Sequence, residues 1–267
     1  MFLAIHATNK IVFVDAYGQV KLFDVNDKSE IWSTEVGFPI LSPPLVYRGH
    51  IYFISSDNRI FSINIENGSV AWSFQTISET KKNLFTASPV AYENTIIVPF
   101  SNGELVAFDH DNGRPIWSEN LSKTSLVSNF DIKDISASPV IQDGIIYSLS
   151  SNGKFMSINV IDGSRNWSID LSGYRTPIIS GNQIYIIDKN GKLICLDKVN
   201  GDVYWITELN KYKKGQDVSN LNLWNGPYLI NSLLYNFSYF GEMKVVSPIN
   251  GEILSSDSLG INKILVP

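Results

Sequence analysis

The chain repeats one pattern of residues six times, and this repeat constrains its fold more than any other feature. Five tryptophans mark the copies: Trp32, Trp72, Trp117, Trp167 and Trp205. A proline lies 28 residues before each of the last four: Pro44, Pro89, Pro139 and Pro177. A glycine that follows Asn or Asp lies 24 residues after each proline: Gly68, Gly113, Gly163 and Gly201. Because several independent positions agree, each copy is expected to form one structural unit.

Two further copies extend the pattern to nearly the whole chain. The first contains Trp32 but has Ala4 in place of proline, and the last begins at Pro227 with Ser255 in place of tryptophan. The six copies cover approximately residues 4–37, 42–77, 88–122, 138–172, 176–210 and 226–260. We therefore predict that residues 1–267 form a single domain of six repeats.

The copy that starts at Pro139 shows what one unit should look like. Short apolar runs, rich in β-branched and aromatic residues, predict four strands: Val140–Ile141, Ile145–Leu149, Phe155–Asn159 and Asn166–Ile169. The Asn152-Gly153 pair between the middle strands is favoured in tight hairpins because both residues tolerate a positive φ. Four short antiparallel strands in roughly 40 residues are typical of a propeller blade. The predicted fold is an all-β propeller of four-stranded antiparallel blades.

Two recurring polar and aromatic positions are interpreted as structural. One large flat tryptophan per copy is expected to pack between adjacent blades and to seal each sheet against the next. A short polar side chain recurs 20 residues after the proline position and should cap backbone amides of a turn. These residues are Asp24, Asn64, Asp109, Asn159 and Asp197.

Composition and isolated motifs exclude several classes of function. The net charge is −5 and the pI about 5.2, without clustered Lys and Arg, which argues against nucleic acid as a partner. The single cysteine, Cys195, excludes an internal disulfide and is interpreted as a small buried residue. His6, His50 and His110 share no metal-ligand spacing, and the last two are expected in exposed turns. We predict no catalytic residues, no metal and no cofactor.

The ends of the chain show no targeting signal. Residues Met1–Ile5 are apolar, but they lack the charged start and cleavage site of a secretory signal. No apolar run approaches the roughly 18–20 residues that a membrane-spanning helix needs.

The repeat itself resembles a known superfamily. The run Asp109–Trp117 follows the pattern Asp-x-x-(Asn/Asp)-Gly-x-x-x-Trp, which resembles pyrroloquinoline-quinone-type propellers. That superfamily contains quinoprotein dehydrogenases and BamB, a lipoprotein scaffold for outer-membrane protein assembly. The C-terminal half resembles the alphaproteobacterial form of BamB in four segments: Asp134–Val140, Thr176–Asn182, Trp224–Pro227 and Ser247–Gly251.

The BamB resemblance implies a larger protein and a set of partners. BamB-like proteins have eight blades, a signal peptide and a lipid-modified cysteine, so we expect this sequence to be a fragment of an eight-bladed ring. The resemblance implies a periplasmic location at the inner face of the outer membrane, through a lipid anchor not present in this sequence. It implies BamA and the Bam complex as partners, together with unfolded outer-membrane proteins.

The docking residues are expected in the connections between copies. Insertions in repeat proteins gather on one face, and that face commonly binds. The three longest connections are Ser73–Ser88, Ser118–Ser138 and Ile206–Gly226. The resemblance assigns BamA docking to Asp134, and to Leu84 and Phe85 in the other docking loop, although Ser136 replaces a second expected aspartate. Alternatively, these connections fold back onto the propeller.

Three other functions are weighed against the scaffold. A quinoprotein dehydrogenase would carry an adjacent cysteine pair and a carboxylate-rich calcium site; the chain has one cysteine and no calcium-loop spacing. We therefore predict that the chain is not an enzyme. Two further functions stay open. One is a propeller that binds a small ligand or cell-wall peptide in its central channel, and the other is a receptor sensor domain.

Overall fold

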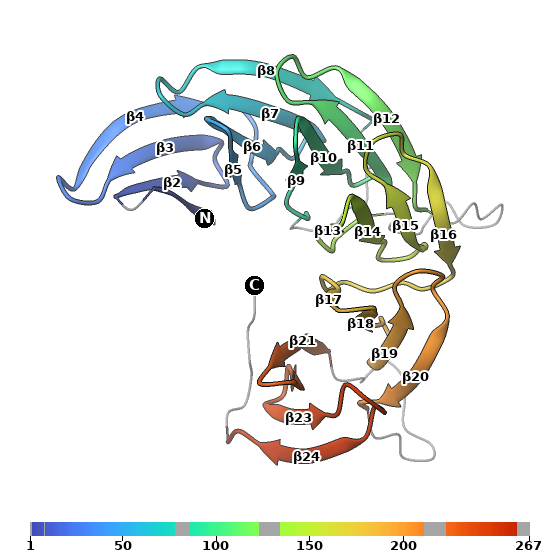
Figure 1. The fold of residues 1–267 in the computed structure, drawn as a ribbon. Helices are drawn as coiled ribbons and strands as arrows, with labels where there is room; N and C mark the ends of the chain where they lie inside the picture. Colours follow the sequence, from blue (N-terminus) through green and yellow to red (C-terminus); the bar gives the residue numbers. More distant parts are fainter. Residues whose placement is uncertain (1, 8, 78–85, 123–133, 211–222, 261–267) are drawn as a thin grey trace.

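The computed structural model describes residues 2–7, 9–77, 86–122, 134–210 and 223–260. These residues form six four-stranded sheets, each built from consecutive antiparallel strands. The sheets, called blades 1 to 6 here, follow one another along an open arc (Figure 1). The predicted fold class, an all-β propeller with six four-stranded repeats, is confirmed.

The strands of the first three blades have the following bounds. Blade 1 contains β1 (Phe2–Ala7), β2 (Lys10–Val14), β3 (Gln19–Asp24) and β4 (Ser29–Glu35). Blade 2 contains β5 (Leu45–Tyr47), β6 (His50–Ile54), β7 (Arg59–Asn64) and β8 (Val70–Gln75). Blade 3 contains β9 (Val90–Tyr92), β10 (Thr95–Pro99), β11 (Glu104–Asp109) and β12 (Pro115–Asn120).

The last three blades repeat the arrangement. Blade 4 contains β13 (Val140–Gln142), β14 (Ile145–Leu149), β15 (Phe155–Asn159) and β16 (Arg165–Ile169). Blade 5 contains β17 (Ile178–Ser180), β18 (Gln183–Ile187), β19 (Lys192–Asp197) and β20 (Val203–Glu208). Blade 6 contains β21 (Trp224–Ile230), β22 (Leu233–Ser238), β23 (Glu242–Val246) and β24 (Ile253–Ser258).

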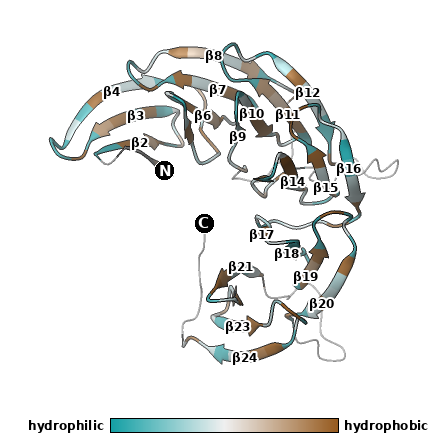
Figure 2. Cartoon of the chain, viewed as in Figure 1, coloured by the Kyte–Doolittle hydropathy of each residue, from teal (hydrophilic) through white to brown (hydrophobic). Residues whose placement is uncertain are grey.

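The hydrophobic core consists of layers between blades. Successive side chains of a strand point to opposite faces of its sheet. Accordingly, Ile51 and Phe53 of β6 pack toward blade 1, while Tyr52 and Ile54 pack toward blade 3. The middle strands are therefore apolar on both faces, and Figure 2 shows hydrophobic residues concentrated on strands such as β7 and β11.

One turn differs from its sequence-based prediction. The strands predicted after Pro139 agree with β13 to β16 within one residue. The glycine of the Asn152-Gly153 turn, however, has no positive φ, although tolerance of a positive φ was the reason that this pair indicated a tight hairpin. Glycine is needed there because the Leu121 carbonyl oxygen lies only 2.0 Å from where a Cβ would stand. The same carbonyl accepts a hydrogen bond from the amide of Lys154 at 3.0 Å.

The arc is open between its first and last blades. Blades 1 and 6 face each other across this opening (Figure 1). A membrane-spanning helix is not found in the described part of the chain.

Candidate protein-binding site

Each pair of neighbouring blades is joined by a tryptophan of the earlier blade. Its indole Nε1 donates to a backbone carbonyl of the next blade in all five joints. The pairs are Trp32–Ile65 (2.9 Å), Trp72–His110 (3.0 Å), Trp117–Val160 (2.9 Å), Trp167–Lys198 (3.2 Å) and Trp205–Pro248 (3.2 Å). The predicted inter-blade position of the five tryptophans thus has a defined geometry.

The recurring glycine completes the same joint. In the next blade it lies against the tryptophan ring, and a Cβ there would approach ring carbons to 3.0 Å or less. The pairs are Gly68–Trp32, Gly113–Trp72, Gly163–Trp117, Gly201–Trp167 and Gly251–Trp205. These contacts hold neighbouring blades against each other in the order of the chain.

The recurring short polar residue caps the turn before the outer strand, as predicted. Asp109 is representative: its Oδ1 accepts hydrogen bonds from the amides of Asp111 (3.0 Å) and Asn112 (3.1 Å). The bond from the amide two residues later also occurs at Asp24, Asn64, Asn159 and Asp197. In blades 2 to 5 these residues therefore shape the turn that carries the joint glycine.

The two predicted docking segments lead into neighbouring blades, and their described ends touch. The amide of Ser88, just before blade 3, donates to Ser138 Oγ, just before blade 4, at 3.0 Å. Ser88 Oγ in turn donates to the carbonyl of Pro43, just before blade 2, at 3.1 Å. Three consecutive lead-in segments are thus tied together along one face, which we call the connection face.

Asp134 is buried on this connection face. It is 0% exposed, and its carbonyl accepts hydrogen bonds from Ser151 N (2.9 Å) and Ser151 Oγ (2.8 Å). Asp134 therefore fastens the segment before blade 4 to the β14–β15 turn. The other two predicted docking residues, Leu84 and Phe85, lie outside the described residues.

Polar contacts also cross between the hairpin turns of the connection face. Asn58 Oδ1, in the β6–β7 turn, accepts hydrogen bonds from Ser101 N (3.1 Å) and Ser101 Oγ (3.0 Å) of the β10–β11 turn. Antiparallel order places the turn between the middle strands and the connection to the next blade at the same end of every sheet. Asn58 and Ser101 are both buried, so these bonds fix the turns of neighbouring blades relative to one another. Loops held in place by a scaffold commonly carry binding residues.

The expectation that His50 and His110 lie in exposed turns is wrong for both, because His50 begins β6 and is half-buried, while His110 is buried. His110 is 5% exposed, its Nδ1 lies 2.5 Å from the Tyr52 hydroxyl, and its ring centroid is 5.1 Å from that of His50. Burial, and next the neighbouring His50, lower the pKa of His110. The repeat contained the missed signal: His110 occupies the position of Ile65 and Val160, which are both buried.

The other candidate chemical groups are structural. Cys195 is buried as expected, and burial raises the pKa of its thiol to about 12. Among the described residues, no group of three or more His, Cys, Asp or Glu is arranged to hold a metal ion.

Comparison with known families identifies the architecture. A family model described as "Outer membrane protein assembly factor BamB" matches residues 3–207. The chain belongs to the BamB family. A BamB of Moranella endobia is 26% identical over 167 residues, which is 62% of this chain and 43% of that protein. A BamB of Escherichia coli is 24% identical over 216 residues, 62% of this chain and 55% of that protein.

An alphaproteobacterial type is also supported. A protein of Rickettsia conorii is 22% identical over 170 residues, 62% of this chain and 41% of that protein. The chain thus spans about half the length of the curated relatives it matches.

Solved structures share the fold. The BamB of Moraxella catarrhalis superimposes with a TM-score of 0.83 at 19% identity, over 94% of this chain and 73% of that one. A europium-containing methanol dehydrogenase superimposes with a TM-score of 0.75 at 12% identity, over 98% of this chain and 71% of that one. At these identities the likeness concerns the propeller fold and not the activity.

Proposed function

We propose that the chain is a non-catalytic scaffold of the outer-membrane β-barrel assembly machinery, which docks BamA through its connection face. The observation that carries the proposal is the hydrogen bond between Ser88 and Ser138. This bond joins the two lead-in segments for which the family resemblance implies docking. Membership of the BamB family and the names of the relatives support the assignment to outer-membrane protein assembly.

The described ends of both segments are anchored to the blades, so these ends would be preorganised for docking. The amide of Thr86 donates to the carbonyl of Leu41 at 3.1 Å, and Ser151 holds the carbonyl of Asp134. A surface that is already ordered loses less conformational entropy when a partner binds. Asp134, being buried, would act in docking by positioning its segment, while Leu84 and Phe85 would supply apolar contacts.

The proposed place of action is the periplasm, at the inner face of the outer membrane. There the partners would be BamA, the other members of the Bam complex and unfolded outer-membrane proteins. The acidic net charge of −5 and the absence of clustered Lys and Arg in the sequence fit protein partners rather than nucleic acid.

Binding of the chain to the soluble domains of BamA tests this proposal. The double substitution Leu84→Asp, Phe85→Asp should weaken binding at least about tenfold, since apolar anchors dominate interface energies. Asp134→Asn should weaken it less, because the backbone carbonyl that Ser151 holds is retained. Glu66→Lys, an exposed change in the β7–β8 turn at the opposite end of the blade, is the matched control and should leave affinity unchanged.

The folded state of each variant is checked by thermal unfolding before its affinity is compared. Asp134→Arg would bury a cation and is expected to lower both stability and affinity. Failure of the folded wild-type chain to bind BamA, or equal loss in the Glu66→Lys control, would remove the connection face from the docking role.

A further inference from the structure

Blade 5 has an arginine at a repeat position where the blades before it have small buried residues. The position lies two residues before the proline of each lead-in segment. Blades 2, 3 and 4 have Ser42, Ala87 and Ala137 there, which are 0%, 3% and 1% exposed. Blade 5 has the half-buried Arg175 instead. Because blade 5 has a neighbouring blade on both sides (Figure 1), this departure is independent of where the sequence begins and ends.

A second cation replaces a small residue in the β18–β19 turn of the same blade. The equivalent turns of blades 2, 3 and 4 contain a serine: Ser56, Ser101 and Ser151. Blade 5 has Lys189, which is exposed, and its Nζ donates to the neutral side chain of Asn152 at 3.1 Å. Two positions that are uncharged in blades 2 to 4 are therefore cationic in blade 5.

The two cations belong to one hydrogen-bonded unit on the connection face. The carbonyl of Ser172, three residues before Arg175, accepts a hydrogen bond from the amide of Lys189 at 3.0 Å. The amide of Gly173 donates to the carbonyl of Ser150 in blade 4 at 3.1 Å. A Cβ on Gly173 would lie only 2.7 Å from a backbone oxygen of β18. The segment that leads to Arg175 is thus clamped between blades 4 and 5.

Arg175 is a half-buried cation without a counter-charge. Within the described part of the chain, its guanidinium has neither an ion-pair partner nor a hydrogen-bond acceptor. Burial lowers the pKa of Arg175, while Tyr228 acts in the opposite direction. An arginine nevertheless stays charged at neutral pH, and withdrawing an unpaired charge from water costs free energy. A carboxylate supplied by a partner would offset this cost.

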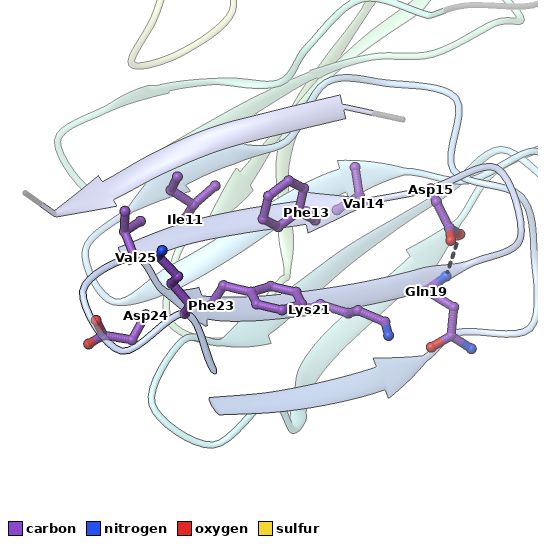
Figure 3. Close-up of a pocket in the computed structure, with 10 residues that line it drawn as sticks. Ile11, Phe13, Val14, Asp15, Gln19, Lys21, Phe23, Asp24 and Val25 are labelled. Atoms are coloured by element: carbon purple, nitrogen blue, oxygen red, sulfur yellow. Dashed lines mark hydrogen bonds between the residues drawn. The ribbon is translucent and has the colours of Figure 1, made fainter. Parts of the chain in front are cut away.

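The nearest carboxylate along the chain, that of Asp188, is engaged in its own turn. Its Oδ1 accepts hydrogen bonds from the amides of Asn190 and Lys192, both at 2.8 Å. In the equivalent turn of blade 1, Asp15 Oδ1 likewise accepts a hydrogen bond from the amide of Gln19 at 3.0 Å (Figure 3). Asp188 therefore shapes a turn, as Asp15 does, and in the described structure it is not paired with either cation of blade 5.

We propose that Tyr174, Arg175 and Lys189, called the blade 5 patch here, bind an acidic segment of a partner protein. The guanidinium of Arg175 presents a planar fork that matches a carboxylate, and Lys189 supplies a second cation. The ring of Tyr174, which is 46% exposed, covers the apolar part of the segment. Anionic membranes are recognised by clusters of about four to eight Lys and Arg, so two cations fit the side chains of a polypeptide better. The patch lies beside the proposed docking segments, but its occupant does not depend on the docking of BamA.

Binding of a labelled peptide, in which glutamate alternates with serine around a central phenylalanine, tests the proposal. Fluorescence anisotropy with the full 267-residue chain should show saturable binding below about 1 mM. Arg175→Gln should weaken this binding at least about tenfold, because a charge-assisted contact is lost. Arg175→Lys should weaken it less, since the charge remains. Arg114→Gln, which removes an exposed arginine from the β11–β12 turn at the opposite end of blade 3, is the matched control and should leave the affinity unchanged.

Arg175→Ala separates a binding role from a structural one. Alanine is the residue of blades 3 and 4 at this position, and the substitution removes an unpaired charge. The variant should therefore unfold at no lower temperature than the wild type, while its affinity for the acidic peptide falls at least about tenfold. If the unfolding temperature falls and the affinity stays the same, Arg175 is a structural residue and the proposal is wrong.

Two further ligands decide what the patch recognises. The same peptide with glutamine in place of glutamate should bind at least about tenfold more weakly. Vesicles of phosphatidylglycerol should show no binding that depends on Arg175. Equal affinity for the two peptides, no binding of the acidic peptide, or binding of the vesicles that Arg175→Gln abolishes would each overturn the proposal.

Discussion

Gly113 lies against the indole ring of Trp72, so closely that a Cβ on the glycine would meet a ring carbon at 2.4 Å. The same tryptophan donates its Nε1 hydrogen to the carbonyl of His110, three residues earlier in the chain, at 3.0 Å. Tryptophan and glycine are thus two halves of one joint, which explains why both recur at fixed positions of the repeat. The joint requires a residue without a side chain at the glycine position as well as the large ring of the tryptophan.

Gly113→Ala should therefore destabilise the fold by about 2–4 kcal/mol. The cost combines the positive φ of 69° with overpacking against Trp72. Gly49→Ala is the matched control, because Gly49 has a φ of 78° but nothing within 4 Å of a Cβ. It should cost about 1 kcal/mol. Chemical denaturation of both variants measures the difference, and equal losses would mean that the ring contact contributes nothing.

The buried Lys244 is expected to contribute to the stability of blade 6. Lys244 is 1% exposed, donates to the carbonyl of Leu209, and lies 5.2 Å from the ring centroid of Trp224. Lys244→Met keeps the length but leaves that carbonyl without its donor, and should cost about 1–3 kcal/mol.

Lys192→Met provides the comparison for this measurement. Lys192 pairs with Glu208 at 3.0 Å on the surface, where such a pair is worth about 0–1 kcal/mol. Urea denaturation should therefore separate the two variants clearly. If the Lys244→Met variant were as stable as the wild type, the free energy cost of desolvating the buried ammonium would equal the free energy gained from its contacts.

The sequence predicted the fold well because its main signal is periodic. The tryptophan, the Asx-Gly turn and the apolar middle strands all indicate the same four-stranded unit. A copy that departs from the pattern at one position can therefore still be assigned from the other copies. Gly153 shows the limit of this reasoning: the Asn-Gly pair was explained by tolerance of a positive φ, but the nearby Leu121 carbonyl determines the need for glycine. A contact between segments far apart in the sequence has no periodic signal.

The candidate site was harder to predict for the same reason. The contact between Ser88 and Ser138 joins residues 50 apart, and nothing in either segment alone predicts it. Burial of Asp134 could not be predicted either, because it depends on Ser151 in a hairpin of the next blade. His110 was placed in an exposed turn by its local sequence, although its repeat position corresponds to buried residues.

Cys195 should be inert in the folded protein. It is fully buried, and its thiol pKa is raised to about 12, so at neutral pH almost no reactive thiolate is present. We expect no reaction with a thiol reagent in native buffer and one equivalent in denaturant. Reaction with the native chain at the rate of a free thiol would show that blade 5 opens readily.

Acid should weaken the joint between blades 2 and 3. Burial lowers the pKa of His110 below its usual value of 6.5, and the adjacent His50 and Arg48 act in the same direction, while Asp111 and Asp109 oppose it. The unfolded chain therefore takes up this proton at a higher pH than the folded chain does. The contribution of His110 to stability is complete above about pH 6.5 and is lost progressively as the pH falls below that value. Denaturation at pH values from about 5 to 8 should show a shallower acid loss for His110→Gln than for the wild type, and identical slopes would contradict this assignment.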